Sequence, residues 1–257
     1  MLGERIAEGR MAEVYAWSDQ RVVKLWKPGF PPQDAAYEFG IVRKVMAAGI
    51  PTPAALEQTQ IDERAGIVYE RVDGQTMDQV GLQDLSRLAE LAQQMATLHL
   101  AIHSRIAPTL PSQVEKLRTR IARIDLLDGP MKASLVARLE DLADGDTACH
   151  GDFHPRNIII ANEGPVVIDW NDAGRGHPSV DVARAMLIMQ MIDYYADVPA
   201  DLKQVLAQFR DAYLNHYLEL SGLLRESITW WLPVLAAARL NENIPEETEI
   251  LLQMAQS

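Results

Sequence analysis

The sequence predicts an α+β protein in two lobes, because strand patterns come first and helical patterns follow. The first seventy residues alternate short apolar runs with turn signals, whereas the chain beyond Val180 has helical periodicity almost throughout. The pattern changes near Asp73-Gly74, a turn dipeptide that predicts a hinge. We therefore expect an N-terminal lobe at 1–72 and a C-terminal lobe at 73–257.

The smaller lobe is expected to be a sheet with one helix. Residues 22–26 read Val-Val-Lys-Leu-Trp and residues 67–72 read Ile-Val-Tyr-Glu-Arg-Val, and both runs are typical of strands. Between them a helical pattern spans about 34–48. It ends in the stretch Gly-Ile-Pro-Thr-Pro at 49–53, which cannot continue a helix.

Helices dominate the larger lobe. Apolar residues recur at steps of three and four from Leu82 to Ile102 and predict one long amphipathic helix. Two shorter helical patterns follow, and four more lie toward the end of the chain. The six are expected at about 113–127, 131–142, 180–195, 201–220, 227–241 and 246–256.

Composition excludes several classes of protein. With 257 residues, 48% hydrophobic and 23% charged, the chain has the usage of an ordinary folded protein. Its formal net charge of −12 argues against nucleic acid or an anionic membrane as a partner, because such a surface repels polyanions. Cys149 is the only cysteine, and neither a leader pattern nor a membrane-spanning apolar stretch is visible. We therefore expect a cytoplasmic location.

The most informative stretch combines a polar loop with a buried strand. Residues 150–157 read HGDFHPRN, and after an apolar run residues 166–170 read VVIDW. Phosphoryl transfer needs a carboxylate that orients the acceptor hydroxyl and takes its proton, and it needs oxygen ligands for the Mg²⁺ ions that neutralise a triphosphate. The pattern H-x-D-x-x-x-x-N followed by a strand-ending Asp is typical of that arrangement.

Each polar residue of this stretch has a candidate role. Asp152 is the candidate catalytic base, and Asn157 and Asp169 are the candidate metal ligands. Asp169 follows a buried-strand signature, so its carboxylate emerges where the strand ends. Taken singly, each has an ordinary alternative as a turn residue, a loop amide or a cap. Their joint spacing favours the functional interpretation.

These residues resemble the aminoglycoside phosphotransferase and choline kinase branch of the protein-kinase-like fold, whose loop reads HGDxxxxN. Upstream, Lys24 is similar to the strand lysine that reaches the α- and β-phosphates, and Glu38 to the helix glutamate that holds it. Downstream, Asp181 in HPSVDVA resembles the aspartate that braces the catalytic loop, and His150 resembles a brace within that loop. The resemblance covers nearly the whole chain, most closely at 148–185.

The resemblance implies a two-lobed protein-kinase-like fold, with an antiparallel sheet lobe that binds nucleotide and a helical lobe that carries the catalytic and substrate groups. It implies ATP and Mg²⁺ as cofactors and transfer of the γ-phosphoryl group to a hydroxyl of a small molecule such as an aminoglycoside, choline or a sugar. Glu70 and Val72 are expected to offer backbone groups to adenine. The stretch at 9–15, GRMAEVY, has one glycine where protein kinases have a glycine-rich loop.

Lys24 also predicts a partner without any resemblance. It lies within a Val, Leu and Trp strand, where an unpaired ammonium would be costly to bury. Glu38, on the only helix expected in that lobe, is the obvious partner. The alternative is a lysine at the sheet edge whose ammonium reaches solvent.

Acceptor recognition leaves the weakest trace. Asp172 and Glu242 are candidate contacts to a cationic or polyhydroxylated acceptor, with Asp193 and Glu246 as further acidic positions, although charged helix faces are usually only solvated. Four aromatic residues could line an acceptor pocket, but their helical spacing in apolar stretches favours a place in the core. They are Tyr194, Tyr195, Trp230 and Trp231. Neither the oligomeric state nor a preference for ATP over GTP follows from the sequence.

Two other functions remain open from the sequence. A metallohydrolase would use His150, Asp152 and His154, with His177 as a further ligand, but it leaves Lys24, Glu38 and Asn157 without a role. The other is a nucleotide-binding module that has the same fold and no activity. It is disfavoured because the candidate base, both candidate metal ligands and the lysine are all present. The histidines outside this region are expected to be structural. His99 and His103 should be partly buried on the long helix, and His216 should be at the surface.

Overall fold

The computed structural model describes residues 2–140 and 145–256. The chain divides into two compact units. The sheet unit comprises Met1–Val80 and Arg156–Asp172, and the helical unit comprises Gly81–Pro155 and Ala173–Ser257. The division of the chain into lobes at residue 72 stays a prediction.

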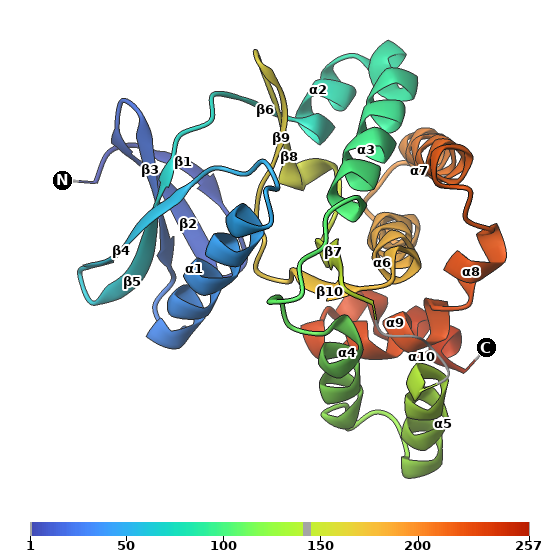
Figure 1. Cartoon of the computed structure of the whole chain (residues 1–257). Helices are drawn as coiled ribbons and strands as arrows, with labels where there is room; N and C mark the ends of the chain where they lie inside the picture. Colours follow the sequence, from blue (N-terminus) through green and yellow to red (C-terminus); the bar gives the residue numbers. More distant parts are fainter. Residues whose placement is uncertain (1, 141–144, 257) are drawn as a thin grey trace. The chain divides into compact units, whose positions relative to one another are not determined.

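The sheet unit contains a five-stranded antiparallel sheet in the order β1-β2-β3-β5-β4. Its strands are β1 Arg5–Glu8, β2 Ala12–Ser18, β3 Arg21–Trp26, β4 Ala55–Ile61 and β5 Arg64–Glu70. The helix α1, Pro32–Ala47, packs on β4 and β5 (Figure 1). It begins with a proline and ends before Gly49, whose φ of 73° only glycine adopts at little cost. The expected sheet with one helix is thus confirmed.

A second, three-stranded antiparallel sheet in this unit has the order β6-β8-β9. Its strands are β6 Gly74–Thr76, β8 Ile158–Ala161 and β9 Gly164–Val167. The turn expected at Asp73-Gly74 is therefore wrong, because Gly74 pairs with Ala161 as the first residue of β6. A Cβ on Gly74 would lie 2.5 Å from the carbonyl oxygen of Ile160, so glycine permits a close strand approach here.

The remaining elements are mostly helical. The α-helices are α2 Met77–Gln83, α3 Leu88–His103, α4 Gln113–Ala122, α5 Gly129–Glu140, α6 Pro178–Met191, α7 Ala200–Ser221, α8 Arg225–Thr229, α9 Leu232–Arg239 and α10 Thr248–Ala255. The 3₁₀ turns are η1 Leu85–Arg87, η2 Pro155–Asn157, η3 Ile192–Tyr194, η4 Leu240–Glu242 and η5 Pro245–Glu247. Two short strands, β7 Thr147–Cys149 and β10 Gly174–Gly176, pair antiparallel. An α+β layout is therefore confirmed.

One expected helix end differs from the structure, and another lies outside the described residues. The helix expected at 113–127 ends at Ala122 as α4. The helix expected at 131–142 is α5, and residues 141 and 142 lie outside the described part of the chain. None of the described helices is long and apolar enough to cross a membrane.

The single long helix expected from Leu82 to Ile102 is wrong. The chain leaves the helix at Asp84, whose carboxylate accepts hydrogen bonds from the Ser86 amide at 3.1 Å and the Ser86 hydroxyl at 2.6 Å. Such a cap competes with helix continuation. Leu82 and Leu85 are consequently 53% and 51% exposed. The buried apolar face begins at Leu91, within α3.

The expectation that four aromatic residues belong to the core is also partly wrong. Trp231 is buried, and its indole donates a hydrogen bond of 2.7 Å to the Ser179 hydroxyl. Trp230 and Tyr194 are instead 38% and 42% exposed, and Tyr195 is half-buried. The helix expected at 227–241 breaks after Thr229, so neighbouring tryptophans face different environments.

A buried ion pair fastens the C-terminal elements of the helical unit. Arg239, the last residue of α9, donates from Nε and Nη2 to the two carboxylate oxygens of Glu247 at 2.5 and 2.8 Å. Both side chains are at least nine-tenths buried. The Tyr195 hydroxyl also donates to Glu247, at 2.9 Å. Removing Glu247 would leave the buried Arg239 charge with Glu242 as its remaining anionic partner, so much of its compensation would be lost.

We therefore expect Glu247→Gln to lower the free energy of unfolding by about 3 kcal/mol, measured by urea denaturation. The matched control is Glu219→Gln, which removes the partner of His216 at a carboxylate that is 79% exposed. That change should cost less than about 0.5 kcal/mol. Equal effects of the two substitutions would contradict a structural role for the buried pair.

Candidate active site

Lys24 lies in the middle of β3, and the alternation of that strand decides where its side chain points. Val23 and Leu25 are fully buried on one face of the sheet, so Lys24 and Trp26 lie on the opposite face. The Lys24 Nζ atom lies 5.4 Å from the centre of the Trp26 ring. Only 17% of the lysine side chain is exposed, so its ammonium needs anionic partners.

Two carboxylates provide those partners within the sheet unit. The Nζ of Lys24 donates to both oxygens of Glu38, on α1, at 2.9 Å each, and to Oδ1 of Asp169 at 3.0 Å. The Tyr69 hydroxyl, from β5, donates to Oε1 of Glu38 at 2.8 Å. The ion pair that the sequence predicts between Lys24 and Glu38 is thus present, and the alternative of a lysine reaching only solvent is wrong.

The charges of this cluster support one another. Burial opposes the positive charge of Lys24, but the carboxylates of Asp169 and Glu38 outweigh it and hold the pKa of the ammonium above its ordinary value. Burial raises the pKa of the Tyr69 phenol well above its usual range, and the neighbouring Glu38 adds to that effect. Tyr69 therefore stays protonated and remains a hydrogen-bond donor to Glu38.

Asp169 has an uncommon backbone conformation for a residue other than glycine. It follows β9, and its φ is 63°, in the left-handed region. This conformation costs roughly 1 kcal/mol or more, although aspartate and asparagine tolerate it better than most residues. The side chain remains 43% exposed while paired with Lys24. Local strain of this kind is common where a side chain must be aimed at a ligand.

Asn157 is held next to the segment that carries Asp169. It ends the 3₁₀ turn η2 and is buried. Its backbone carbonyl accepts a hydrogen bond of 2.9 Å from the Ile168 amide, and Ile158 pairs with Val167 in the β8–β9 register. Both predicted metal ligands therefore lie on adjoining segments of the sheet unit. Amide and carboxylate oxygens are ligands that Mg²⁺ accepts.

The predicted nucleotide segments lie on the same sheet. Glu70 ends β5, with its carboxylate accepting from the Ala54 amide at 3.2 Å, and Val72 follows two residues later. The hairpin that would approach phosphates is closed by a hydrogen bond of 2.8 Å from the Gly9 amide to the Ala12 carbonyl. Roles for these segments in nucleotide binding stay predictions.

The predicted catalytic loop runs from residue 150 to 157, and its first part, which lies in the helical unit, is held by one carboxylate. Asp181, in the first turn of α6, accepts the His150 amide at 2.5 Å on Oδ2 and the Gly151 amide at 2.8 Å on Oδ1. His150 in turn accepts the Asp152 amide at 3.2 Å on Nδ1. The bracing that the sequence predicts for Asp181 and His150 is therefore present as hydrogen bonds.

Asp152 directly follows this braced segment, and His154 and Arg184 contribute to the electrostatic environment of its carboxylate. Its Oδ2 lies 3.4 Å from Nε2 of His154. Burial opposes ionisation, but the hydrogen bond and charge of His154, together with the charge of Arg184, hold the pKa of Asp152 well below its usual range. The Asp152 carboxylate is therefore ionised and able to accept a proton.

The structure does not assemble the metallohydrolase site. Within residues 2–140 and 145–256, the one group of three or more His, Cys, Asp or Glu ligand atoms close enough to hold a metal is that of His99, His103 and Asp181. His177 instead caps α6, with its Nδ1 accepting from the Ser179 amide at 3.2 Å. The ligand set of His150, Asp152, His154 and His177 is therefore wrong.

Sequence reasoning missed several residues of this region. Tyr69 has an ordinary strand pattern that gives no sign of its bond to Glu38. Arg184 lies in the apolar pattern of α6, and its Nε donates to the Gly151 carbonyl at 3.4 Å. An arginine in a buried helix face is a usable signal, because it must have a partner. His99 and His103 are more fully buried than expected, and His216 is partly exposed.

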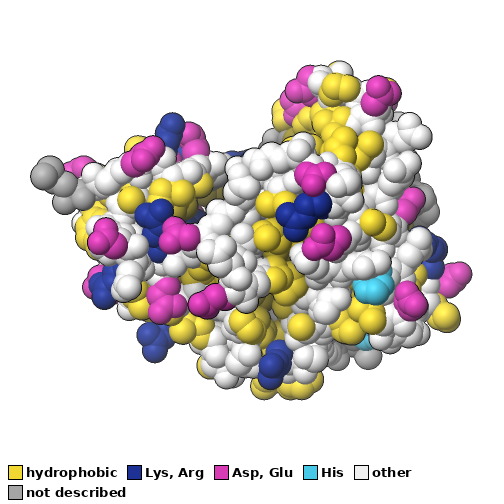
Figure 2. Space-filling model, turned by 90° about the horizontal axis from the view of Figure 1, so that it is seen from above, with side chains coloured by type: hydrophobic (Ala, Val, Ile, Leu, Met, Phe, Trp, Pro, Cys, Tyr) yellow, Lys and Arg dark blue, Asp and Glu magenta, His cyan; other side chains and the backbone are white. Residues whose placement is uncertain are grey.

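Two of the four acidic positions expected to contact an acceptor form ion pairs within the helical unit. Glu242 pairs with Arg184 and, at 2.9 Å, with Arg239. Asp193 pairs with Arg210 at 3.0 Å. Glu246 is exposed, and Asp172 is half-buried at the end of the sheet unit. On the face shown in Figure 2, basic and acidic side chains of the described residues are mixed with one another.

Comparisons with known proteins agree with this geometry. The family model described as the phosphotransferase enzyme family matches residues 3–227. No curated protein sequence matches the chain. Among solved structures, the chain is similar to a thermostable mutant of the aminoglycoside phosphotransferase APH(4)-Ia in its apo form, with a TM-score of 0.67 and 17% identity. That comparison covers 100% of this chain and 93% of the other.

Two further structures show the same fold. An aminoglycoside-3′-phosphotransferase of type VIII has a TM-score of 0.59 and 22% identity, covering 95% of this chain and 91% of the other. A choline/ethanolamine kinase family protein from Mesorhizobium loti has a TM-score of 0.61 and 12% identity, covering 100% and 87%. The expected protein-kinase-like fold is thereby confirmed. With its family model matched over most of its length, the chain belongs to the phosphotransferase enzyme family.

Proposed function

We propose that this protein is an ATP-dependent kinase that transfers the γ-phosphoryl group to a hydroxyl of a small molecule. The observation that carries the proposal is the Lys24 ammonium held between Glu38 and Asp169. In phosphoryl transfer a lysine fixed by a glutamate holds the phosphates, and an aspartate beside it binds the metal. The family and its small-molecule kinase neighbours support the same reaction.

Asp152 acts as the base in this proposal. Its low pKa makes it a weak general base, so its main work is to orient the hydroxyl and accept the proton late in the transfer. The hydrogen bonds from the backbone of His150 and Gly151 to Asp181 hold the loop that aims it. Arg184 adds a positive charge beside the carboxylate.

Lys24 neutralises phosphate oxygens, and Glu38 and Tyr69 keep it in place. Asn157 and Asp169 suit Mg²⁺, because they present an amide and a carboxylate oxygen on adjoining segments and the Asp169 side chain is partly exposed. When bound, the ion would neutralise charge on the triphosphate. Glu70 and Val72 would contact adenine through their backbone groups.

The choice of ATP rests on similar proteins. One neighbour is a ternary complex of a thermostable APH(4)-Ia mutant with ADP and hygromycin B, and another is an amicoumacin kinase in complex with AMP-PNP, Ca²⁺ and Ami. A third neighbour is a GDP and kanamycin complex. Because the chain is at most 22% identical to the structures named here, its nucleotide preference must be measured directly.

Charge argues for an acceptor with one or few cationic groups. The net charge of −12 favours neutral or cationic molecules over polyanions. Two of the acidic positions expected to contact an acceptor, Asp193 and Glu242, are neutralised by arginines. We therefore rank the exposed Glu246 above them as an acceptor contact, and Asp172 stays a candidate contact. A hydroxyl-rich acceptor with few amines fits these charges best.

The second candidate, an inactive nucleotide-binding module, differs in one measurable property. Incubation with MgATP and a panel of hydroxyl compounds, including aminoglycosides, choline and sugars, should release ADP with at least one panel member above the rate with water alone. An inactive module would bind the nucleotide, as seen by calorimetry, and show no acceptor-dependent release of ADP.

Replacing the base tests the catalytic assignment. We expect Asp152→Asn to lower kcat by about 10²–10⁴, because a positioned base is lost, while the Kd for MgATP changes little. Steady-state kinetics and calorimetry on the same preparation measure the two effects. A near-normal kcat would remove Asp152 from the mechanism.

Replacing Asp169 tests the metal assignment and allows for its backbone strain. Asp169→Asn keeps a residue that tolerates φ of 63° and removes the charge, whereas Asp169→Ala adds strain as well. Both should weaken MgATP binding and lower kcat by at least about tenfold, with saturation shifted to higher Mg²⁺. A zinc-selective chelator should leave the native enzyme unaffected. Inactivation by that chelator and recovery with zinc would contradict the assignment.

A double-mutant cycle tests the Lys24–Glu38 pair. Lys24→Ala should raise the KM for ATP and lower kcat, and Glu38→Gln should show a weaker version of the same profile, because it misplaces the lysine. Since both changes disable one device, the losses should be far from additive, with a coupling of about 1–3 kcal/mol. The surface pair Arg118–Glu140, at 3.3 Å, gives a control cycle without effect on activity. Additive losses at Lys24 and Glu38 would contradict their joint role.

A further inference from the structure

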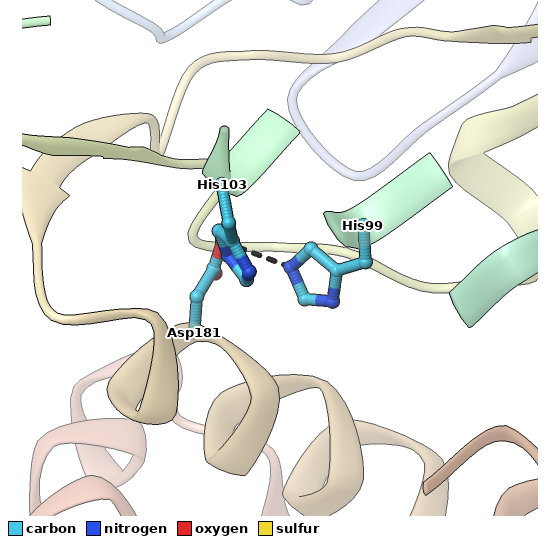
Figure 3. Close-up of side chains that lie close together, drawn as sticks. All are labelled: His99, His103 and Asp181. Carbon is cyan, nitrogen blue, oxygen red and sulfur yellow. Dashed lines mark hydrogen bonds and ion pairs between the residues drawn. The ribbon is translucent and has the colours of Figure 1, made fainter. Parts of the chain in front are cut away.

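A buried polar cluster lies under the catalytic loop in the helical unit, and none of the roles above uses all of it. We call it the histidine cluster, and its members come from α3, α6 and α7, of which α7 packs on both others (Figure 1). Figure 3 shows its two histidines and its aspartate. They are His99, His103, Asp181, Tyr213 and Tyr217, all of them buried. So many polar groups in one core are costly unless every donor and acceptor is paired.

The cluster consists of two tyrosine–histidine pairs, one helical turn apart, that share one aspartate. The Nδ1 atom of His99 lies 2.6 Å from the Tyr213 hydroxyl oxygen, and its Nε2 atom lies 3.0 Å from Oδ2 of Asp181. His103 repeats this arrangement, at 2.6 Å from the Tyr217 hydroxyl and 3.2 Å from the same carboxylate oxygen. The histidines are four residues apart on α3 and the tyrosines four apart on α7, so both pairs point at one carboxylate.

One placement of protons satisfies all of these hydrogen bonds. Asp181 already accepts the amides of His150 and Gly151, and an ionised carboxylate can only accept. Each histidine must therefore donate to it from Nε2. A neutral imidazole has one donor, so each Nδ1 accepts and each tyrosine hydroxyl donates. The carboxylate then receives four hydrogen bonds, two from imidazoles and two from the loop backbone.

His99, His103 and Asp181 each offer one ligand atom, and these three atoms lie within 4.8 Å of one another. That spacing is also compatible with a metal ion. A cation would need the Nε2 lone pairs of His99 and His103 and would reverse both tautomers. The proton placement above satisfies both ring nitrogens of each histidine, both tyrosine hydroxyls and both oxygens of Asp181. The hydrogen-bonded arrangement therefore accounts for the cluster without an ion.

We propose that His99 and His103 are positioning residues for the catalytic loop. By donating to Asp181 they fix the carboxylate that holds the loop backbone, and Asp152 directly follows the held residue Gly151. Without these donors the carboxylate keeps only its two bonds to the loop backbone, so the anchor that aims the base is held less firmly. The effect on catalysis rests on the proposed kinase function, whereas the hydrogen-bond arrangement does not.

The charge state of the cluster supports this arrangement. Burial, and after it the neighbouring His103, lowers the pKa of His99 to about 3, so the ring is neutral at physiological pH. Burial disfavours the charge of Asp181, but the two histidines outweigh it and hold its pKa well below the ordinary range. In the unfolded chain His99 binds a proton near the ordinary histidine pKa of 6.5, whereas in the folded chain it stays neutral at that pH. His99 therefore lowers the stability of the fold as pH falls below that value. The titratable groups that face it are His103, His150, Asp181 and Tyr213.

Two substitutions at one position separate the donor from simple packing. His99→Leu removes the donor to Asp181, and His99→Gln keeps an amide N–H in a similar place. We expect His99→Leu to lower kcat by about 10–100-fold, the range for losing a group that orients a functional residue, with the KM for ATP nearly unchanged. His99→Gln should recover most of kcat. The control Ser179→Ala breaks a buried hydrogen bond of the same helix α6 to Trp231 and should leave kcat nearly unchanged.

A spectroscopic readout tests the cluster independently of activity. In ¹⁵N-labelled protein, the ring nitrogens of His99 should show a neutral imidazole that is protonated on Nε2 and does not titrate between about pH 5 and 9. If the kinase assay fails while this spectrum is found, the proposed function fails and the hydrogen-bond arrangement stands. A titration near pH 6.5, the Nδ1-protonated tautomer, or stoichiometric zinc in the purified protein would overturn the arrangement.

Catalysis provides the second contradicting result. A folded His99→Leu with unchanged kcat, or equal losses for His99→Leu and His99→Gln, would overturn the positioning role. Should His99→Leu fail to fold, Tyr213→Phe serves instead, because it removes one hydroxyl from an otherwise unchanged side chain. That variant should lower kcat severalfold and shift the ¹⁵N resonances of His99. Unchanged kcat and unchanged resonances would likewise contradict the proposal.

Discussion

The structure of the sheet unit depends on the cost of burying one ammonium. Lys24 projects from a strand that buries Val23 and Leu25 on its other face, so its charge must be met by groups from outside the strand. Glu38 meets it from α1, and Asp169 meets it from the segment after β9. The pairing therefore ties the helix, the large sheet and the small sheet of this unit to one atom. A nucleotide phosphate would find there a cation already held by surrounding carboxylates.

A second carboxylate organises the helical unit in a comparable way. Asp181 accepts four hydrogen bonds. Two come from the backbone of the predicted catalytic loop, and two come from histidines whose other ring nitrogen contacts a tyrosine hydroxyl. Both centres use the same rule, since a buried charge persists only when several groups of opposite polarity converge on it. In each case the paired residue is far from its partners in the sequence, so the contact exists only in the folded chain.

The sequence was sufficient where the signal is local. The catalytic loop, the strand before Asp169 and the strand with Lys24 have short patterns whose residue types and spacing suit the chemistry, and burial cost alone predicts a partner for Lys24. The histidine cluster gives no such local signal. His99 and Tyr213 meet only because α3 packs against α7, and helix periodicity does not specify that packing.

Single residues explain the errors in the fold. Asp84 ends a helix whose apolar periodicity continues through it, because a side-chain cap competes with the next turn. Gly74 has the appearance of a turn residue but serves a close contact between strands. Trp230 lies in an apolar stretch and is nevertheless exposed, since the helix breaks beside it. Each of these three features depends on contacts in the folded chain, which the periodicity of the sequence does not specify.

The most direct test of the central claim is the fate of the γ-phosphoryl group. ³¹P NMR of a reaction with MgATP and a hydroxyl-compound acceptor should show a new phosphomonoester appearing in step with ADP, and Asp152→Asn should suppress it. Release of inorganic phosphate alone would indicate transfer to water rather than to an acceptor. Unchanged ATP with every acceptor, despite measured nucleotide binding, would contradict the assignment of this chain as a small-molecule kinase.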